Sequence, residues 1–156
     1  MIKCNHWEVK EANKSGEIVS KCGDNALYVA ADNGNLIMAM NDKGDAVVKF
    51  TPFFPELSFP LFVGRKWSSK YSGQEGIVKW TGDMSCEATA FEEIKVAAGK
   101  FDAFRIECLN KWDSGIVFVH GTKKSTHWYA PAVHLKVKSI NEESRWSYEV
   151  AGTDFH

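Results

Sequence analysis

The stretch that decides the fold is Leu27–Met40, which reads LYVAADNGNLIMAM. Two apolar runs, Leu27–Ala30 and Leu36–Met40, flank a polar turn. An Asn-Gly pair between apolar runs is typical of a type I′ hairpin loop, because both central residues must tolerate positive φ. A helix would lose propensity and hydrogen-bonding continuity at such a pair. We therefore predict two antiparallel strands that reverse direction at Asn33-Gly34.

Similar turn signals divide the rest of the chain into short segments rich in Val, Ile, Phe, Tyr and Trp. The further turn candidates are Asn13–Gly16, Asn41–Asp45, Ser72-Gly73, Thr81–Asp83, Ala97–Lys100, Asp113–Gly115, Gly121-Thr122 and Asn141-Glu142. This regular spacing predicts an antiparallel meander instead of alternating strands and helices. We therefore predict an all-β chain, a meander of about ten or eleven short strands with little helix.

Length and composition predict one ordinary globular domain. The chain has 156 residues, of which 44% are hydrophobic and 25% are charged, a balance that excludes disordered and fibrous chains. Its formal net charge of -1 supplies no concentrated basic face, so we expect no nucleic-acid partner. No apolar run approaches the length of a membrane span, and residues Met1–His6 lack the apolar core of a signal peptide. We expect no membrane span.

A proline-rich segment divides this single domain of residues 1–156. Thr51–Pro60 holds three of the four prolines, so it cannot be a central strand and we expect it to cross the surface or one end of the sheet. The predicted parts are an N-terminal meander at residues 1–51, a crossover at 52–64 and a C-terminal meander at 65–152.

The hairpin around Gly99 allows a prediction of register. The apolar residues of the two arms alternate with polar ones, and the even positions face the core. The apolar residues are Cys86, Ala88, Ala90, Ile94, Val96, Phe104, Ile106 and Cys108, and the polar residues are Glu87, Thr89, Glu93, Lys95, Arg105 and Glu107. A three-residue loop, with Val96 opposite Lys100, puts both apolar sets on one face.

The four cysteines contain no Cys-x-x-Cys pair, which makes redox and zinc-ribbon chemistry improbable. The predicted register sets Cys86 opposite Asn110, with its Cβ roughly 7 Å from that of Cys108. That distance is too long for a disulfide unless a bulge shifts the strands. Cys4 and Cys22 flank one turn and are the better candidates for a bridge.

Four segments of the chain resemble a bacterial family of exported β-rich proteins, which is itself distantly similar to lipoprotein carriers of the LolA/LolB type. The segments are Phe59–Trp67, Glu92–Phe104, Trp128–Val133 and the closing strand at Trp146–Val150. The family pattern reads Phe-Pro-Leu-x-Val-Gly-Lys-x-Trp, then Glu-x-Val-x-Val-Pro-Ala-Gly-x-Phe, then Trp-Tyr-Ala-Pro-x-Val-Gly. Ala97 replaces the usual proline, and His134 stands where glycine is common.

The resemblance implies a strongly curved antiparallel sheet, or an incomplete barrel, with an apolar concave face. It also implies export to the periplasm or to the extracellular space. It transfers no activity, because the family has no established catalytic residues.

Glu92 is the most informative polar residue, because it falls on the predicted core side of its strand. A carboxylate there must find a partner or take up a proton. The favoured partners are a backbone amide, the indole of Trp67 or Trp80, or Arg65; the alternative is a role in orienting a ligand. A hydrolase that uses Glu92 and a histidine is the least favoured function, since neither a second acid nor a nucleophile is evident. We predict no catalytic residues.

The histidines His120, His127 and His134 recur every seven residues but match no compact metal-ligand pattern. We therefore interpret them as incidental surface or strand-end residues. No metal site and no cofactor is predicted.

Aromatic residues suggest the function. The tryptophans are Trp7, Trp67, Trp80, Trp112, Trp128 and Trp146. They either fill the core or line an apolar cleft, and Trp128-Tyr129, just before a proline, are predicted at a rim near an exposed edge.

Our first hypothesis is a non-enzymatic binding protein that holds a hydrophobic small molecule or lipid on the concave face of the sheet. The predicted ligand-binding residues are Trp67, Trp80, Glu92, Phe104, Trp128 and Tyr129. The alternative is a structural or protein–protein interaction module with a filled core. An apolar cavity larger than about 300 Å³ would favour ligand binding, whereas a filled interior would favour the module.

Overall fold

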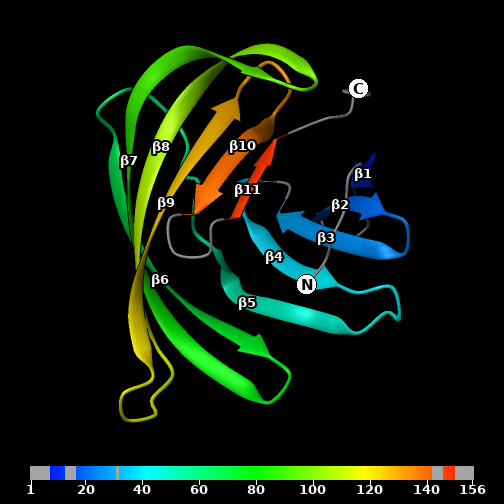
Figure 1. The fold of residues 1–156 in the computed structure, drawn as a ribbon, viewed down its shortest axis with the longest axis vertical. Coiled ribbons are helices and arrows are strands. Elements are labelled where there is room, and N and C mark those ends of the chain that lie inside the picture. Colours follow the sequence, from blue (N-terminus) through cyan, green and yellow to red (C-terminus); the bar gives the residue numbers. More distant parts are fainter. Residues whose placement is uncertain (1–7, 13–16, 31, 142–145, 150–156) are drawn as a thin grey trace.

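The computed structural model describes residues 8–12, 17–30, 32–141 and 146–149. Eleven strands follow one another in a single antiparallel sheet, in the order of the sequence (Figure 1). The strands are β1 Glu8–Ala12, β2 Glu17–Cys22, β3 Asn25–Ala30, β4 Leu36–Met40, β5 Ala46–Phe54, β6 Lys66–Glu75, β7 Val78–Val96, β8 Gly99–Asp113, β9 His120–Ala130, β10 Leu135–Asn141 and β11 Trp146–Glu149. No helix occurs within these ranges, so the predicted all-β meander is confirmed.

The sheet is strongly curved and forms a half-barrel. In Figure 1 the long strands β6 to β9 make one wall, and β2 to β5 curve round to form the opposite side. Pairing of β5 with β6 joins the two predicted meanders in one sheet. We call the face that carries Phe50, Tyr71, Met84 and Ile106 the inner face, and the opposite face the outer face.

The β3–β4 hairpin reverses at Asn33-Gly34, as predicted, although its loop is longer than a two-residue turn. The Ala30 amide donates to the Asn35 carbonyl at 2.9 Å, and the Gly34 amide donates to the Ala30 carbonyl at 2.7 Å. Four residues therefore separate the hydrogen-bonded Ala30 and Asn35. Gly34 has φ +70°, a backbone conformation that glycine adopts without strain.

The predicted surface placement of the proline-rich crossover is wrong for its middle, which lies inside the half-barrel, whereas the part from Phe59 to Gly64 is largely exposed. β5 continues through Pro52 to Phe54, and Pro55–Leu57 are buried. Asn35 anchors this segment, because its side chain accepts from the Leu57 amide and donates to the Leu57 carbonyl, both at 2.8 Å. An internal segment without strand partners can be buried only when its backbone groups are satisfied in this way.

The register of the β7–β8 hairpin also differs from the prediction. Val96 pairs with Gly99 across a two-residue loop, and a bulge at Thr89 then shifts the strands by one position. Cys86 consequently lies opposite Cys108, and the two form a disulfide with a Cα–Cα distance of 4.1 Å. The predicted separation is wrong because it assumed a three-residue loop and no bulge, and each of these differences shifts the pairing by one position. The proposed Cys4–Cys22 bridge involves residues outside the described part of the chain.

Contacts with distant residues hold this bulge in place. The Ala88 amide donates to the Arg65 carbonyl at 2.9 Å, and the Gly64 amide donates to the Ala88 carbonyl at 2.7 Å. The Arg105 Nε donates to Thr89 Oγ1 at 3.1 Å. The end of the crossover thus pairs the backbone of Ala88 next to the bulge, and a side chain of β8 binds the hydroxyl of Thr89.

The bulge reverses which residues of β7 point to each face of the sheet, because residues opposite one another in antiparallel strands point to the same side. Beyond Thr89, Phe91 pairs with Phe104 on the inner face, and Ile94 pairs with Phe101 on the outer face. A second apolar cluster therefore forms on the outer face, around buried Ala103, Ala130 and Val137, with Ile94, Phe101, Trp128 and Val133 packed against it.

Three predicted turns, at Ser72-Gly73, Thr81–Asp83 and Gly121-Thr122, are wrong because they lie within strands. Their glycines make room for aromatic rings from the neighbouring strand. A Cβ at Gly73 would overlap the indole of Trp80, and one at Gly121 would lie 2.9 Å from the indole Nε1 of Trp112.

Replacement of Gly82 by alanine is expected to lower the free energy of unfolding by about 1–3 kcal/mol. The new Cβ would overlap the ring of Tyr71, whose hydroxyl is hydrogen-bonded to Asn110. Urea denaturation followed by tryptophan fluorescence would measure the change. Ser85→Ala, an exposed site in the same strand, is the control and should stay within about 0.5 kcal/mol; equal effects of the two substitutions would contradict the close packing.

Candidate functional site

The inner face is filled between β5 and β9. The buried cluster there comprises Phe50, Leu57, Tyr71, Met84, Cys86, Ile106, Cys108 and Tyr129. Tyr71 packs edge-to-face against Phe50 and Phe54, with ring centroids 5.8 Å and 5.1 Å apart. Leu57 brings the crossover into this cluster, so side chains occupy the middle of the half-barrel.

A buried charged network joins the crossover to β9 and β10. The Glu56 carboxylate lies 3.0 Å from His127 Nε2 and accepts a hydrogen bond from Lys136 Nζ. His127 Nδ1 lies 2.8 Å from Ser139 Oγ, and His127 Nε2 lies 3.0 Å from Ser125 Oγ. Every polar atom of the imidazole therefore has a partner. The arrangement anchors the crossover to two strands.

Electrostatics keep Glu56 ionised. Burial alone raises the pKa of the Glu56 carboxyl, but the neighbouring His127 and Lys136 lower it well below its ordinary value of 4.5. Burial raises the pKa of Tyr129 above its ordinary value of 10.0. The prediction that the histidines are incidental is therefore wrong for His127, although His120 is exposed at the start of β9.

The third histidine, His134, lies in the β9–β10 turn. Its backbone has φ +53°, in the left-handed region that favours glycine. This conformation gives a physical reason for the glycine expected at the position.

An aromatic row crosses the inner face beyond the bulge. Phe91, Phe104 and Tyr129 lie opposite one another on β7, β8 and β9. The rings of Phe91 and Phe104 are 4.7 Å apart, and Phe59 of the crossover lies 5.3 Å from Tyr129. Phe91 is 52% exposed and Phe59 is 43% exposed. We call Phe59, Phe91, Phe104 and Tyr129 the aromatic row; its ends are open to solvent.

The structure divides the six predicted ligand-binding residues between the two faces. Phe104 and Tyr129 belong to the aromatic row. Trp67 and Trp80 are also on the inner face but pack against the filled cluster, and Trp67 Nε1 donates to the Pro55 carbonyl at 3.4 Å. The predicted rim position is wrong for Tyr129, which is buried in a strand flanked on both sides.

Glu92 and Trp128 lie on the outer face, where Trp128 Nε1 donates to Glu92 Oε1 at 2.9 Å. Arg105 Nη1 is 3.9 Å from the same oxygen, and Lys138 Nζ lies 5.6 Å from the centroid of the Trp128 ring. An indole and an arginine do contact Glu92, as expected, but they are not Trp67, Trp80 or Arg65. Glu92 is half-exposed instead of core-facing, because the bulge turns it outward.

Sequence reasoning missed Phe91, Phe59 and the Glu56 network. Phe91 is odd-numbered, so a hairpin without a bulge places it outside. Glu56 lies in the crossover, where the sequence shows no alternation of apolar and polar residues that would predict its burial.

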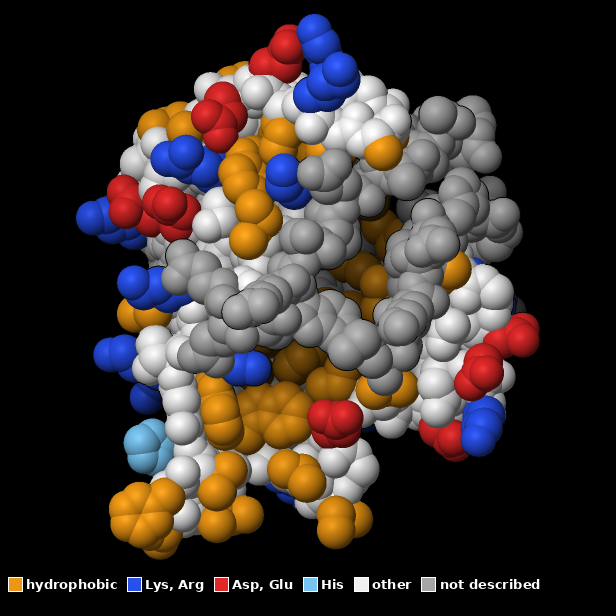
Figure 2. Space-filling model, in the orientation of Figure 1, with side chains coloured by type: hydrophobic (Ala, Val, Ile, Leu, Met, Phe, Trp, Pro, Cys, Tyr) orange, Lys and Arg blue, Asp and Glu red, His pale blue; other side chains and the backbone are white. Residues whose placement is uncertain are grey.

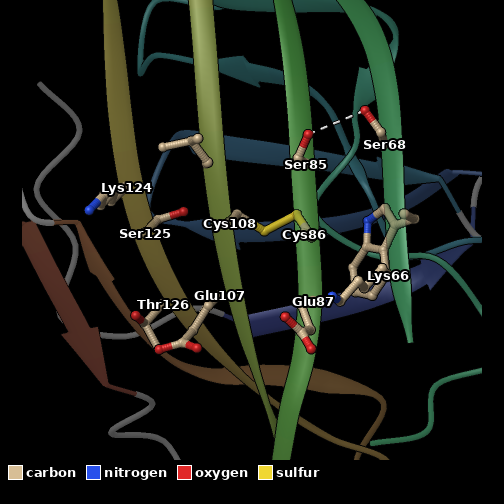
Figure 3. A pocket seen from close by; sticks show the side chains of 12 residues that line it. Lys66, Ser68, Ser85, Cys86, Glu87, Glu107, Cys108, Lys124, Ser125 and Thr126 are labelled. Atoms are coloured by element: carbon tan, nitrogen blue, oxygen red, sulfur yellow. Dashed lines mark hydrogen bonds between the residues drawn. A yellow bond between two sulfur atoms is a disulfide. The ribbon is translucent and has the colours of Figure 1, made fainter. Parts of the chain in front are cut away.

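Two hollows lie on the outer face, and most of the residues that line them are polar. The first, of about 790 Å³, is shown in Figure 3 and lies over cross-strand rows that include Lys66 beside Glu87 and Glu107 beside Thr126. The second, of about 580 Å³, is lined by residues such as Lys70, Asp83 and Lys111. Both hollows are open to solvent, and neither is the apolar cavity expected of a ligand carrier.

Neither the arrangement of side chains nor the comparison with known proteins identifies a function for this chain. Among the residues that the structure describes, no three His, Cys, Asp or Glu side chains gather as metal ligands. The same residues include no helix long and apolar enough to cross a membrane. The chain matches no family model, no curated protein and no solved structure.

Proposed function

We propose that this chain is a non-catalytic binding protein that accepts a hydrophobic or lipid-like ligand on the aromatic row. The observation that carries the proposal is the exposure of Phe91 and Phe59 at the ends of a row whose middle is formed by partly buried Phe104 and buried Tyr129. Exposed rings held by ordered neighbours offer apolar area at little entropic cost. A ligand lying along the row would cover both exposed ends.

The disulfide supports a proposal about location. Cys86 and Cys108 are bonded to each other in adjacent strands, and structural disulfides persist mainly in oxidising compartments. We therefore propose that the protein acts in the periplasm or outside the cell.

A titration with the fluorescent probe N-phenylnaphthylamine tests the binding proposal. Phe91→Ser is expected to weaken probe binding by about tenfold, because it removes one ring from the exposed end of the row. Phe62→Ser is the matched control, since Phe62 is also 52% exposed but lies outside the row. The proposal fails if the probe does not bind, or if both substitutions weaken binding equally.

The filled interior favours a second candidate, an interaction module that contacts another protein. Leu57 and Glu56 occupy the space in which a deep ligand pocket would lie. Native mass spectrometry separates the two candidates, because a binding protein should retain an apolar ligand that Phe91→Ser releases. A protein that retains no ligand and does not bind the probe would support the interaction module.

A further inference from the structure

Two neighbouring hairpins display apolar side chains at one end of the sheet. The β6–β7 turn carries Ile77 and Val78, and the β8–β9 loop carries Ile116–Val119. Ile77 is 98% exposed and Phe118 is 91% exposed. Both hairpins end at the lower edge of Figure 1, and apolar side chains gather at the same edge of Figure 2. We call these six residues the apolar tips.

Hydrogen bonds hold the β8–β9 loop in the conformation that exposes these side chains. The Gly115 amide donates to Asp113 Oδ1 at 2.7 Å, and Ser114 Oγ donates to the Val119 carbonyl at 2.7 Å. Phe118 has φ +68°, a conformation that is unfavourable for a bulky side chain. A loop that holds a phenylalanine outward at such a cost suggests that the exposed ring has a use.

The strands that lead to the apolar tips carry more lysines than carboxylates, together with two tryptophans. Residues 70–83 and 109–124 contain five lysines and three carboxylates, a local charge of +2 with His120 neutral, whereas the whole chain carries -1. Trp80 and Trp112 lie on the inner face; Trp80 follows Val78 by two positions, and Trp112 precedes Ile116 by four. Lysine and tryptophan beside protruding apolar residues are the side chains favoured where a protein meets an anionic lipid surface.

We propose that the apolar tips dock this protein on the surface of an anionic lipid bilayer, with Phe118 and Ile77 entering the headgroup boundary. Six residues on two separate tips are too few for a protein partner, whose interface usually includes about 20–30 residues on each side. Shallow insertion of a few apolar side chains, helped by lysines that contact anionic headgroups, suits two small projections. This docking is separate from the aromatic row and does not depend on it.

Vesicle flotation tests the proposal with the full chain. The expected result is flotation with vesicles of phosphatidylcholine and phosphatidylglycerol, and much weaker flotation with phosphatidylcholine alone. Val117→Ser combined with Phe118→Asn should lower partitioning by more than about tenfold; asparagine is chosen because it tolerates positive φ. Ile77→Ser, at the other tip, provides an independent variant.

The matched control is Phe62→Ser combined with Val63→Ser, which removes one phenylalanine and one valine that are 52% and 54% exposed on the crossover. It should float as the unaltered protein does. The proposal is overturned if the unaltered protein does not float, if the tip and control variants float equally, or if the two vesicle compositions bind equally. Because the tip variants keep the aromatic row, their binding of N-phenylnaphthylamine should be unchanged, which separates a failure of docking from a failure of ligand binding.

Discussion

Replacement of Glu56 by glutamine is expected to lower the free energy of unfolding by about 3–5 kcal/mol. The buried carboxylate faces two cationic or hydrogen-bonding partners, His127 and Lys136. Glutamine has nearly the same shape but no charge, so the Lys136 ammonium would lose the carboxylate that compensates its desolvation. Urea denaturation at neutral pH, followed by tryptophan fluorescence, would measure the loss.

The same substitution should change the pH dependence of stability. Because the pKa of Glu56 is lowered by folding, ionisation of this carboxyl stabilises the folded state above the unfolded pKa, and the contribution is lost as the pH falls toward the folded pKa. The difference between the original protein and Glu56→Gln should therefore be largest above about pH 5 and should shrink progressively below the ordinary value of 4.5. A difference that does not change with pH would contradict the ionised state of Glu56.

The control for Glu56 is Glu93→Gln. Glu93 lies 3.7 Å from Lys100, and both side chains are 64% exposed. An exposed pair of this kind contributes at most about 1 kcal/mol. If the two substitutions had the same effect, burial of the Glu56 network would not be the source of its contribution.

Replacement of both Cys86 and Cys108 by alanine is expected to lower the free energy of unfolding by about 3 kcal/mol. The two residues are 22 positions apart in the sequence, so the disulfide restricts a loop of intermediate length in the unfolded chain. Thermal and urea unfolding of the variant would measure the change.

Reduction of the unaltered protein gives an independent measurement of the same contribution. Dithiothreitol should lower its stability to about that of the double variant and should not affect the double variant itself. Equal stability of the oxidised and reduced protein would show that the bond adds nothing to the fold.

Local chemistry explains why the architecture could be predicted. Leu27–Met40 contains two apolar runs around Asn-Gly, and this pattern can be satisfied only by reversing the chain. Glycine signals of the same kind gave wrong turn predictions within strands, where Gly73, Gly82 and Gly121 lie beneath aromatic rings. A turn glycine and a glycine that accommodates a ring look alike in the sequence, because the ring comes from another strand.

The site was harder to predict, because a register shift of one residue moves the side chains of a strand to the opposite face of the sheet. The alternation in β7 is correct up to Ala88, and the bulge at Thr89 reverses it. Glu92 thereby moves to the outer face, where it meets Trp128, whereas Phe91 joins Phe104 on the inner face. The hydrogen bonds from Ala88 to Gly64 and Arg65 connect segments more than 20 residues apart, so no local pattern announces them.

By itself, the sequence determined that this chain is an antiparallel meander, because the period of its apolar residues and the conformational demands of its turns are local properties. Only the tertiary structure decided that Pro55–Leu57 of the crossover lie inside the half-barrel, that Cys86 meets Cys108, and that Glu56 is buried against His127 and Lys136. Those outcomes depend on which distant backbone and charged groups compensate one another once water is excluded, and that pairing exists only after the sheet has closed around the crossover.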